Sequence, residues 1–188
     1  GGGSADAAAT LRALNTLWGA GLDDAALQSI ARALGADVPV CVFGAPAYMT
    51  GAGETFAPMR APSFAAVLVN PLMPLATPLV YREFDRQQLG GAFTEKPVPV
   101  WADHSEALTS IAALDNDLEA PAVSLMPEIG VIAEVLRNDA RVLHAGLSGS
   151  GATMFALTTD FAASESLAAD IRAAHPDWWA IEAELAGA

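Results

Sequence analysis

Two amphipathic helices are predicted near the start of the chain. Leu11, Leu14 and Trp18 recur at the spacing of one helix face, in a helix that ends at about Gly19. A second helix runs from Asp23 or Asp24, either of which can cap its N-terminus, to Gly35, where a glycine can adopt the left-handed conformation of a C-terminal cap. The apolar stripe of this second helix consists of Leu27, Ile30, Ala31 and Leu34.

Short apolar runs bounded by glycine and proline predict strands along the rest of the chain. These strands are expected at residues 40–43, 47–50, 55–57, 64–70, 142–147, 152–157 and 179–185. Further helices are expected after Pro78, from Pro127 onward, and from Phe161 to a stop at Pro176. Because the elements do not follow the regular strand–helix–strand repeat of a parallel sheet, we expect an α+β fold with a mainly antiparallel sheet flanked by helices.

A domain boundary is predicted where Pro58 and Pro62 interrupt the pattern. We expect residues 1–60 to form the last part of one domain and residues 61–188 to form a second domain. Residues 71–100 are rich in proline and glycine, and they give no clear prediction apart from the short helix after Pro78.

The composition is that of a globular protein with a sizeable core. Of the 188 residues, 53% are apolar, but no apolar run approaches the length of a membrane span, and the first residues lack the basic and apolar pattern of a signal peptide. The single cysteine, Cys41, excludes an internal disulfide framework and is expected to be a small buried residue. We therefore expect a cytoplasmic protein that does not associate with membranes.

The charge argues against nucleic acid as a partner. The net charge is −13, and the nine basic residues are scattered and include one lysine, Lys96. Nucleic-acid binding depends on clustered lysine and arginine that neutralise phosphates. A polyphosphate ligand would instead have to be held by backbone amides, a helix terminus and a divalent cation.

Two glycine clusters stand out, and the first indicates where phosphates could bind. Residues 1–3 are glycines, followed by Ser4 and a helix, so that backbone N–H groups and the positive end of a helix could meet one anion. The second cluster, residues 148–151, fits an ordinary hairpin turn between two strands. Because no strand precedes the first cluster, we expect the chain to be a fragment that lacks a preceding part.

Several other site motifs are absent from the sequence. There is no G-x-x-x-x-G-K-[ST] pattern of a P-loop, and Met154 stands where a dinucleotide-binding pattern would need its third glycine. Residues 146–150 lack the last glycine of a hydrolase elbow. His104, His144 and His175 do not have the spacing of metal ligands, so we interpret them as structural histidines.

Four strings occur in the order found in one superfamily of kinases. They are GGGSADAAATLRALN, GADVPV, NDLEAPA and LSGSGATMFAL, which begin at residues 1, 35, 116 and 147. On these strings the chain resembles the GHMP kinases (galactokinase, homoserine kinase, mevalonate kinase and phosphomevalonate kinase). Within them it is similar to the kinases of 4-diphosphocytidyl-2-C-methyl-D-erythritol. The resemblance extends to Trp178 and Trp179, which we interpret as packing residues.

The resemblance implies roles for individual residues. Asp37 would be the catalytic aspartate that orients or accepts the proton of the attacking hydroxyl, although a turn aspartate would look the same in sequence. Ser4 would also contact magnesium, and Tyr81 would stack on the cytosine ring unless it is a helix-core residue. The implied ATP-binding residues are Gly1, Gly2, Gly3, Ser4 and Ala5. The implied substrate-binding residues are Thr77, Tyr81, Gly149, Ser150 and Gly151.

The implied function is the phosphorylation of the 2-hydroxyl of 4-diphosphocytidyl-2-C-methyl-D-erythritol with ATP and Mg²⁺, a step of non-mevalonate isoprenoid biosynthesis. One alternative is a kinase of the same superfamily that acts on homoserine or a mevalonate derivative. Another is a nucleotide-binding module without catalysis. A homodimer is compatible with the resemblance. Because the family's N-terminal lysine and much of its nucleotide and cytidine pocket are not in this sequence, we expect the chain alone to be inactive or nearly so.

Overall fold

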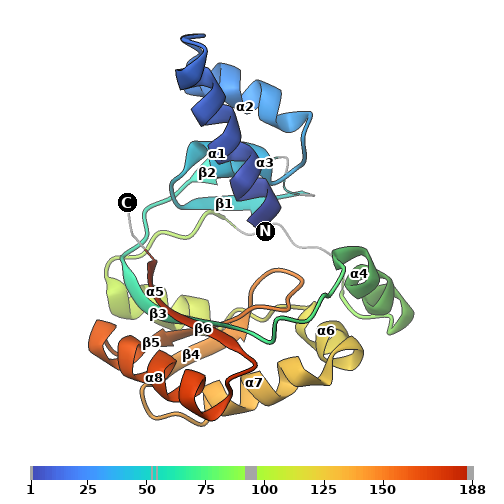
Figure 1. Ribbon diagram of the computed structural model, residues 1–188, viewed down its shortest axis with the longest axis vertical. Helices are drawn as coiled ribbons and strands as arrows, with labels where there is room; N and C mark the ends of the chain where they lie inside the picture. Colours follow the sequence, from blue (N-terminus) through green and yellow to red (C-terminus); the bar gives the residue numbers. More distant parts are fainter. Residues whose placement is uncertain (1, 52, 54, 92–96, 186–188) are drawn as a thin grey trace. The chain divides into compact units, whose positions relative to one another are not determined.

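The computed structural model describes residues 2–51, 53, 55–91 and 97–185. The chain divides into two compact units, each of which is considered by itself. Unit 1 contains residues 1–61, 96–101 and 187–188, and unit 2 contains residues 62–95 and 102–186. In Figure 1 most of unit 1 is blue to teal, and most of unit 2 is green to red.

The described part of unit 1 combines three helices with a two-stranded antiparallel hairpin (Figure 1). The helices are α1 (Gly2–Leu17), α2 (Asp24–Arg32) and α3 (Val38–Phe43), and the strands are β1 (Ala47–Thr50) and β2 (Thr55–Pro58). Buried apolar residues from the three helices form one cluster, which consists of Ala8, Leu27, Ala31, Val38 and Val42. The two predicted N-terminal helices and the strands at 47–50 and 55–57 are confirmed.

The predicted strand at residues 40–43 is wrong, because this segment forms α3. Pro39 lies in the first turn of α3, where the missing N–H of proline has no helical partner to lose. Gly44 ends the helix in the left-handed conformation, with a φ of 69°. A short apolar run has the same composition in a buried helix as in a buried strand, so periodicity could not separate the two.

The second helix also ends earlier than predicted. Its N-terminus is capped as expected, since the Asp23 carboxylate accepts a hydrogen bond of 2.8 Å from the backbone N–H of Ala26. At the other end, however, α2 stops at Arg32, and Ala33 in a right-handed conformation is its C-cap. Gly35 therefore lies beyond the helix and does not cap it.

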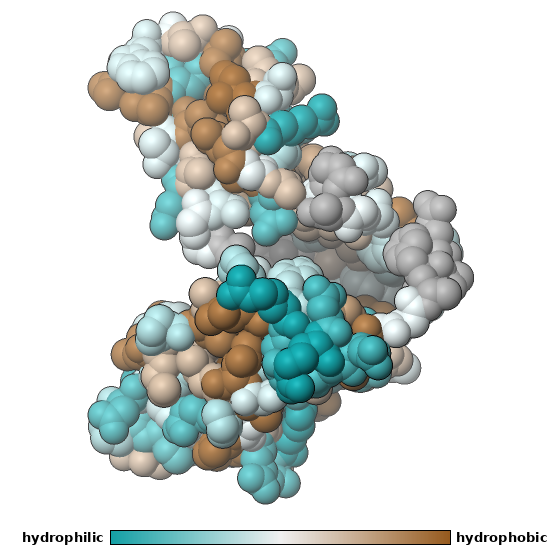
Figure 2. Space-filling model, turned by 90° about the vertical axis from the view of Figure 1, so that its right-hand side faces the viewer, coloured by the Kyte–Doolittle hydropathy of each residue, from teal (hydrophilic) through white to brown (hydrophobic). Residues whose placement is uncertain are grey.

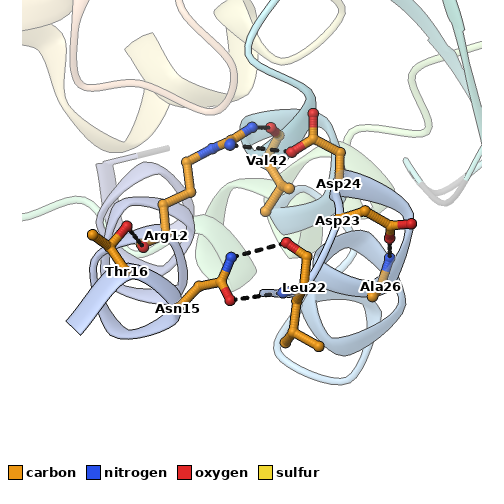
Figure 3. A network of polar contacts seen from close by, with 8 residues as sticks. All are labelled: Arg12, Asn15, Thr16, Leu22, Asp23, Asp24, Ala26 and Val42. Carbon is orange, nitrogen blue, oxygen red and sulfur yellow. Dashed lines mark hydrogen bonds and ion pairs between the residues drawn. The ribbon is translucent and has the colours of Figure 1, made fainter. Parts of the chain in front are cut away.

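A polar network joins the three helices of unit 1 (Figure 3). Arg12 of α1 donates to the Asp24 carboxylate at 3.2 Å and to the backbone carbonyl of Val42 in α3. The Asn15 side chain donates to the Leu22 carbonyl at 2.9 Å and accepts from the Leu22 N–H at 3.0 Å. The network fixes the helix that begins at the first glycine cluster against the helix that follows Asp37.

Part of the apolar surface of the unit 1 helices is exposed. Figure 2 shows hydrophobic residues, in brown, gathered over the helices of the unit drawn at the top. Of the two predicted helix stripes, Leu27 and Ala31 are buried, whereas Trp18 is 70% exposed and Leu34 is 57% exposed. The periodicity therefore predicted the helices correctly but not the burial of each residue in the stripe.

Unit 2 is built on a four-stranded antiparallel sheet with the order β4–β5–β3–β6. Its strands are β3 (Phe64–Asn70), β4 (Val142–Leu147), β5 (Met154–Thr158) and β6 (Trp179–Leu185). Its helices are α4 (Thr77–Arg86), α5 (His104–Ala112), α6 (Glu119–Leu125), α7 (Pro127–Arg137) and α8 (Phe161–Ala174). The expectation of an α+β fold with a mainly antiparallel sheet is confirmed, whereas α5 and α6 were not predicted.

The core of unit 2 lies between the sheet and the helices α7 and α8. Figure 1 shows these two helices on the same face of the sheet. The buried cluster includes residues of the strands, of α7 and of α8, among them Val67, Val69, Ile132, Leu136, Met154, Leu167 and Ile171. Apolar burial of this kind is the main source of stability for such a unit.

Trp178 closes one end of this core. The side chain is 7% exposed, its Nε1 donates to the Glu128 carboxylate at 2.9 Å, and its ring stacks on His175 with centroids 3.8 Å apart. These contacts support the interpretation of Trp178 as a packing residue and of His175 as structural. Trp179, which begins β6, is 41% exposed.

Arginine side chains donate hydrogen bonds to backbone carbonyls of both edge strands of the sheet. On β4, Arg137 donates to the Ala145 carbonyl at 3.3 Å. On β6, Arg172 donates to the Ala180 carbonyl at 2.9 Å. Each arginine comes from a helix that packs on the sheet, so the helices complete hydrogen bonds that an edge strand cannot make with a neighbour.

We predict that truncating the core side chain Leu136 destabilises the protein. Leu136 is fully buried, and the substitution Leu136→Ala should lower the free energy of unfolding by about 2–5 kcal/mol, because it removes buried methyl groups and leaves a cavity. Leu143→Ala is the matched control, since Leu143 is 42% exposed. Urea unfolding of both variants tests this, and equal losses would contradict the prediction.

A second prediction concerns Glu83 of α4. Hydrogen bonds from Arg86, and then from Gln87, lower the pKa of this carboxyl from 4.5 to about 2, and Ser124 of α6 also donates to it. Since the pKa in the folded state lies below that in the unfolded state, the stabilisation is complete above pH 4.5 and is lost as the pH falls towards 2.

The substitution Glu83→Gln should therefore destabilise the protein at pH 7, and the difference from wild type should shrink as the pH falls from 4.5 to 2. Urea unfolding at a series of pH values measures this difference. Glu165→Gln, on the exposed side of α8, serves as the control. A difference that stays constant down to pH 2 would refute the prediction.

Candidate active site

The first glycine cluster forms the N-terminal turn of α1 rather than a loop before it. The helix begins at Gly2, and its first turn contains no acidic residue. Gly2, Gly3 and Ala5 are exposed, and Ser4 is half-buried. Such a turn presents free backbone N–H groups and the positive end of the helix dipole, so it can accept an anion. Gly1, which we also predicted to bind phosphate, lies outside the described residues.

Asp37 is exposed and immediately precedes α3. It occupies the N-cap position of that helix, and its carboxylate does not cap the helix. The neighbouring Val38 belongs to the same buried cluster as Ala8, which lies one turn after Ser4 in α1. The first turn of α1 and the candidate catalytic carboxylate are therefore attached to one small core within unit 1.

The turn of the β1–β2 hairpin lies directly against Asp37. A Cβ atom added to Gly53 would lie 3.0 Å from Asp37 Oδ1 and 3.2 Å from the terminal carbon of Met49. Gly53 also has a φ of 98°, which side chains disfavour. Its backbone can approach the carboxylate this closely because it lacks a side chain.

The predicted substrate-binding residues lie together in unit 2. Thr77 is the first residue of α4, and its hydroxyl is 2.8 Å from the hydroxyl of Ser150. Tyr81 follows one turn later on the same face of α4 and is 54% exposed, so it is not a helix-core residue. The structure thus brings Thr77 against the second glycine cluster and leaves the Tyr81 ring free to contact a ligand.

The second glycine cluster, which we call the 148–151 loop, connects β4 and β5. The Ser148 N–H donates to the Thr153 carbonyl at 2.9 Å, and the Gly151 N–H donates to the Ser148 carbonyl at 3.0 Å. Gly149 and Gly151 have φ values of 59° and 84°, so both need the freedom of glycine. The loop is a hairpin connection in which Ser148 and Gly149 are exposed and Ser150 and Gly151 are half-buried.

Sequence reasoning assigned no role to Asn116, which contacts this loop. Its side chain donates to the carbonyls of Leu147 and Gly149 and accepts from the N–H of Leu118. The bond from Leu118 closes the local turn that an asparagine side chain often makes with the backbone N–H two residues later. This tendency of asparagine was the one feature of the sequence that pointed to any of these three bonds. The contacts with the loop are separated by 31 and 33 positions and could not be read from the pattern.

A groove with a volume of about 1330 Å³ lies beside β4 in unit 2. Its lining includes Asn116, Arg137, Glu119 and His144, and none of the predicted site residues. Arg137 pairs with Glu119 at 2.6 Å. Burial, and then the positive charge of Arg137, lower the pKa of His144, so this side chain is more readily neutral than a free histidine.

The described residues contain neither a cluster of metal-binding side chains nor a membrane-spanning helix. No group of three or more histidine, cysteine, aspartate or glutamate side chains in them could hold a metal ion. Across the same part of the chain, no helix has the length and apolar character needed to cross a membrane.

Comparison with known families gives two separate matches. The model of the GHMP kinases N-terminal domain matches residues 1–45, and the model of the GHMP kinases C-terminal region matches residues 99–177. Together the matches span more than half of the chain. The chain belongs to the GHMP kinases. The members most relevant here are proteins named 4-diphosphocytidyl-2-C-methyl-D-erythritol kinase.

Two such GHMP kinases come from rhizobia. The protein of Bradyrhizobium diazoefficiens is 45% identical over 95% of this chain and 63% of its own length. That of Rhizobium meliloti is 44% identical over 100% of this chain and 61% of its own length. The chain thus spans less than two thirds of the length of these relatives.

Solved structures agree with the family assignment. A crystal structure of 4-(cytidine 5'-diphospho)-2C-methyl-D-erythritol kinase matches 100% of the chain and 66% of its own chain, with 33% identity and a TM-score of 0.80. Mevalonate kinase of L. major, at 18% identity over 98% of this chain and 65% of its own, has a TM-score of 0.62 and shares the GHMP kinase fold.

We predict that Gly53→Ala disturbs Asp37. The new Cβ would meet the carboxylate in a backbone conformation that alanine disfavours, so the free energy of unfolding should fall by about 1–3 kcal/mol. The carbon NMR signal of the Asp37 carboxylate should also move. Gly21→Ala is the matched control, because Gly21 has a φ of 65° and no atom within 4 Å of an added Cβ. An Asp37 signal that is unchanged in Gly53→Ala, or moved equally in Gly21→Ala, would contradict the prediction.

Proposed function

We propose that this chain forms part of an ATP-dependent kinase that phosphorylates the 2-hydroxyl of 4-diphosphocytidyl-2-C-methyl-D-erythritol, in non-mevalonate isoprenoid biosynthesis. The observation that carries the proposal is the attachment of the glycine-rich turn of α1 and Asp37 to one core in unit 1. The names of the rhizobial relatives support the substrate. A cytoplasmic location and a homodimer stay predictions of the sequence.

In this proposal, backbone N–H groups of the first turn of α1 hold the phosphates of ATP. Gly2 and Gly3 have no atoms within 4 Å of an added Cβ, so a phosphate can approach their backbone. The absence of an acidic side chain in this turn leaves the positive helix end unopposed. This suits a protein of net charge −13, which has few lysines and arginines to neutralise a polyphosphate.

Asp37 accepts or orients the proton of the attacking hydroxyl. As the hydroxyl oxygen forms its bond to the γ-phosphorus, the bond from that phosphorus to the bridging oxygen of ADP breaks, and the proton leaves towards the carboxylate. Phosphoryl transfer needs little covalent chemistry from the protein, so one positioned carboxylate and a set of N–H donors are sufficient. Mg²⁺ bound with ATP would neutralise phosphate charge, and the Ser4 hydroxyl is an oxygen ligand suited to it.

Residues of unit 2 bind the cytidine side of the substrate in this proposal. The exposed ring of Tyr81 can stack on a cytosine, since stacking requires a flat aromatic surface. Thr77 and Ser150 offer two hydroxyls 2.8 Å apart, either of which can also donate to a ligand oxygen. A ligand can approach the backbone of Gly149, which has no atom within 4 Å of an added Cβ, and Gly151 holds the end of the same loop against Leu147.

The proposal is tested in a chimera in which this chain replaces the matching segment of the Bradyrhizobium diazoefficiens kinase. We expect ATP- and Mg²⁺-dependent phosphorylation of 4-diphosphocytidyl-2-C-methyl-D-erythritol. The substitution Asp37→Asn should lower kcat by about 10²–10⁴-fold with little loss of ATP binding, because it removes the proton acceptor. Asp177→Asn removes the same charge from an exposed position between α8 and β6 and should leave kcat unchanged.

Other outcomes would redirect the assignment. A folded chimera that phosphorylates homoserine or mevalonate but not the cytidyl substrate would overturn the substrate and retain the kinase. ATP binding that survives Asp37→Asn without any phosphoryl transfer by the wild-type chimera would favour a nucleotide-binding module. Assays of the 188-residue chain by itself show how much activity it retains without the rest of the relative's sequence.

A further inference from the structure

We propose that Asn116 is a positioning residue that fixes the 148–151 loop in the shape needed for the reaction. No role follows for this residue from the family match, and the inference rests on the proposed function for its link to activity. It is argued from three hydrogen bonds of a single side chain, which lies outside every predicted site.

Asn116 donates both hydrogens of its side-chain amide to carbonyls where β4 ends and the 148–151 loop begins. We call this pair of hydrogen bonds the clamp. Nδ2 donates to the carbonyl of Leu147, the last residue of β4, at 2.9 Å and to the carbonyl of Gly149 at 2.8 Å. Both acceptors are carbonyl oxygens, which cannot donate, so the orientation of the amide is unambiguous. The clamp therefore spans the point where the strand ends and the loop begins.

The third bond holds the asparagine itself. Oδ1 accepts from the N–H of Leu118 at 3.0 Å, which fixes the carboxamide beside the N-terminus of α6. Leu118 packs against the core of unit 2. The clamp thus ties the loop to that core. The loop contains two glycines with positive φ, and without the clamp the backbone of these glycines could change conformation easily.

The loop also contacts α4. Thr77 of α4 contacts the Ser150 hydroxyl at 2.8 Å, and Thr77 is one of the proposed substrate-binding residues. The position of Ser150 relative to Thr77 depends on the conformation of the loop, which Asn116 fixes through Leu147 and Gly149. Loss of the clamp should therefore misplace the proposed substrate contacts without removing any of them.

Asn116→Asp is the sharpest variant, because it changes almost no volume. It replaces an amide that donates to two carbonyls by a carboxylate oxygen that repels both, while the oxygen that accepts from Leu118 is retained. Asn138→Asp is the control, since it adds the same charge to an exposed asparagine lining the same groove beside β4. Asn116→Ala removes the donors without adding charge, and it takes the place of Asn116→Asp if that variant does not fold.

The first measurement is hydrogen–deuterium exchange of the 188-residue chain. Amides of residues 147–151 should exchange about tenfold faster in Asn116→Asp, because two hydrogen bonds to the loop are lost. Exchange of β3 and α7 should stay unchanged, and Asn138→Asp should match wild type throughout. Unchanged exchange of the loop in the Asn116 variants overturns the clamp, whatever the activity.

The second measurement is kinetics in the chimera. Asn116→Asp should lower kcat for the cytidyl substrate by about 100-fold at a temperature where circular dichroism shows the variant to be folded, which a role in stability alone would not produce. Faster loop exchange with unchanged kcat and KM overturns the positioning role. If the wild-type chimera is inactive, the proposed function fails and takes the positioning role with it, and the exchange data still decide separately whether the clamp exists.

Discussion

The two-sided pairing of β3 is the constraint on which unit 2 depends. This strand pairs with β5 through Ala66–Val69 and with β6 along its whole length, so its backbone hydrogen bonds are made by segments near the end of the chain. Ala66, Val67 and Val69 are fully buried between those neighbours and the layers of side chains on the two faces. The sheet cannot assemble until the C-terminal strands are present, which makes it a set of non-local contacts.

The pairing of β3 also fixes both ends of the 148–151 loop. β5 is anchored to β3, and β4 is anchored to β5, so the connection between β4 and β5 starts and ends on fixed strands. Side chains from α4 and from the residues before α6 then hold the connection from two directions. Unit 1 reaches the same result with a small core, in which Ala8 and Val38 tie a glycine-rich helix start to the residue after Asp37.

Capping residues and prolines in the sequence correctly predicted where several helices begin or end. Asp23, Pro127 and Pro176 mark a cap, a helix start and a helix stop, and each helix concerned is present. The pattern failed at residues 40–43, where helix and strand have the same composition, and in α5 and α6, whose short apolar faces gave no clear period. The pattern also predicted a glycine loop before the first helix, whereas α1 already begins at Gly2, because glycines can occur at a helix start as well as in a turn.

The sequence predicted the site residues only in part, and on other grounds than it predicted the helices and strands. The role of Asp37 followed from a resemblance, since an aspartate two residues before a proline could equally be a turn residue. The approach of Gly53 to its carboxylate and the bonds of Asn116 join segments that are far apart along the chain, so they required coordinates. The same holds for Thr77 and Ser150, whose hydroxyls lie 2.8 Å apart across 73 positions.

The arginines on the two edge strands have a consequence for how copies of this protein can meet. An uncapped edge would offer a row of carbonyls to the strand of another molecule, and continuous sheets of that kind lead to aggregates. Here Arg137 takes the Ala145 carbonyl and Arg172 takes the Ala180 carbonyl, so an incoming strand would have to displace a charged side chain at each edge. Extension of the four-stranded sheet at these two carbonyls would therefore cost a hydrogen bond to arginine at each edge.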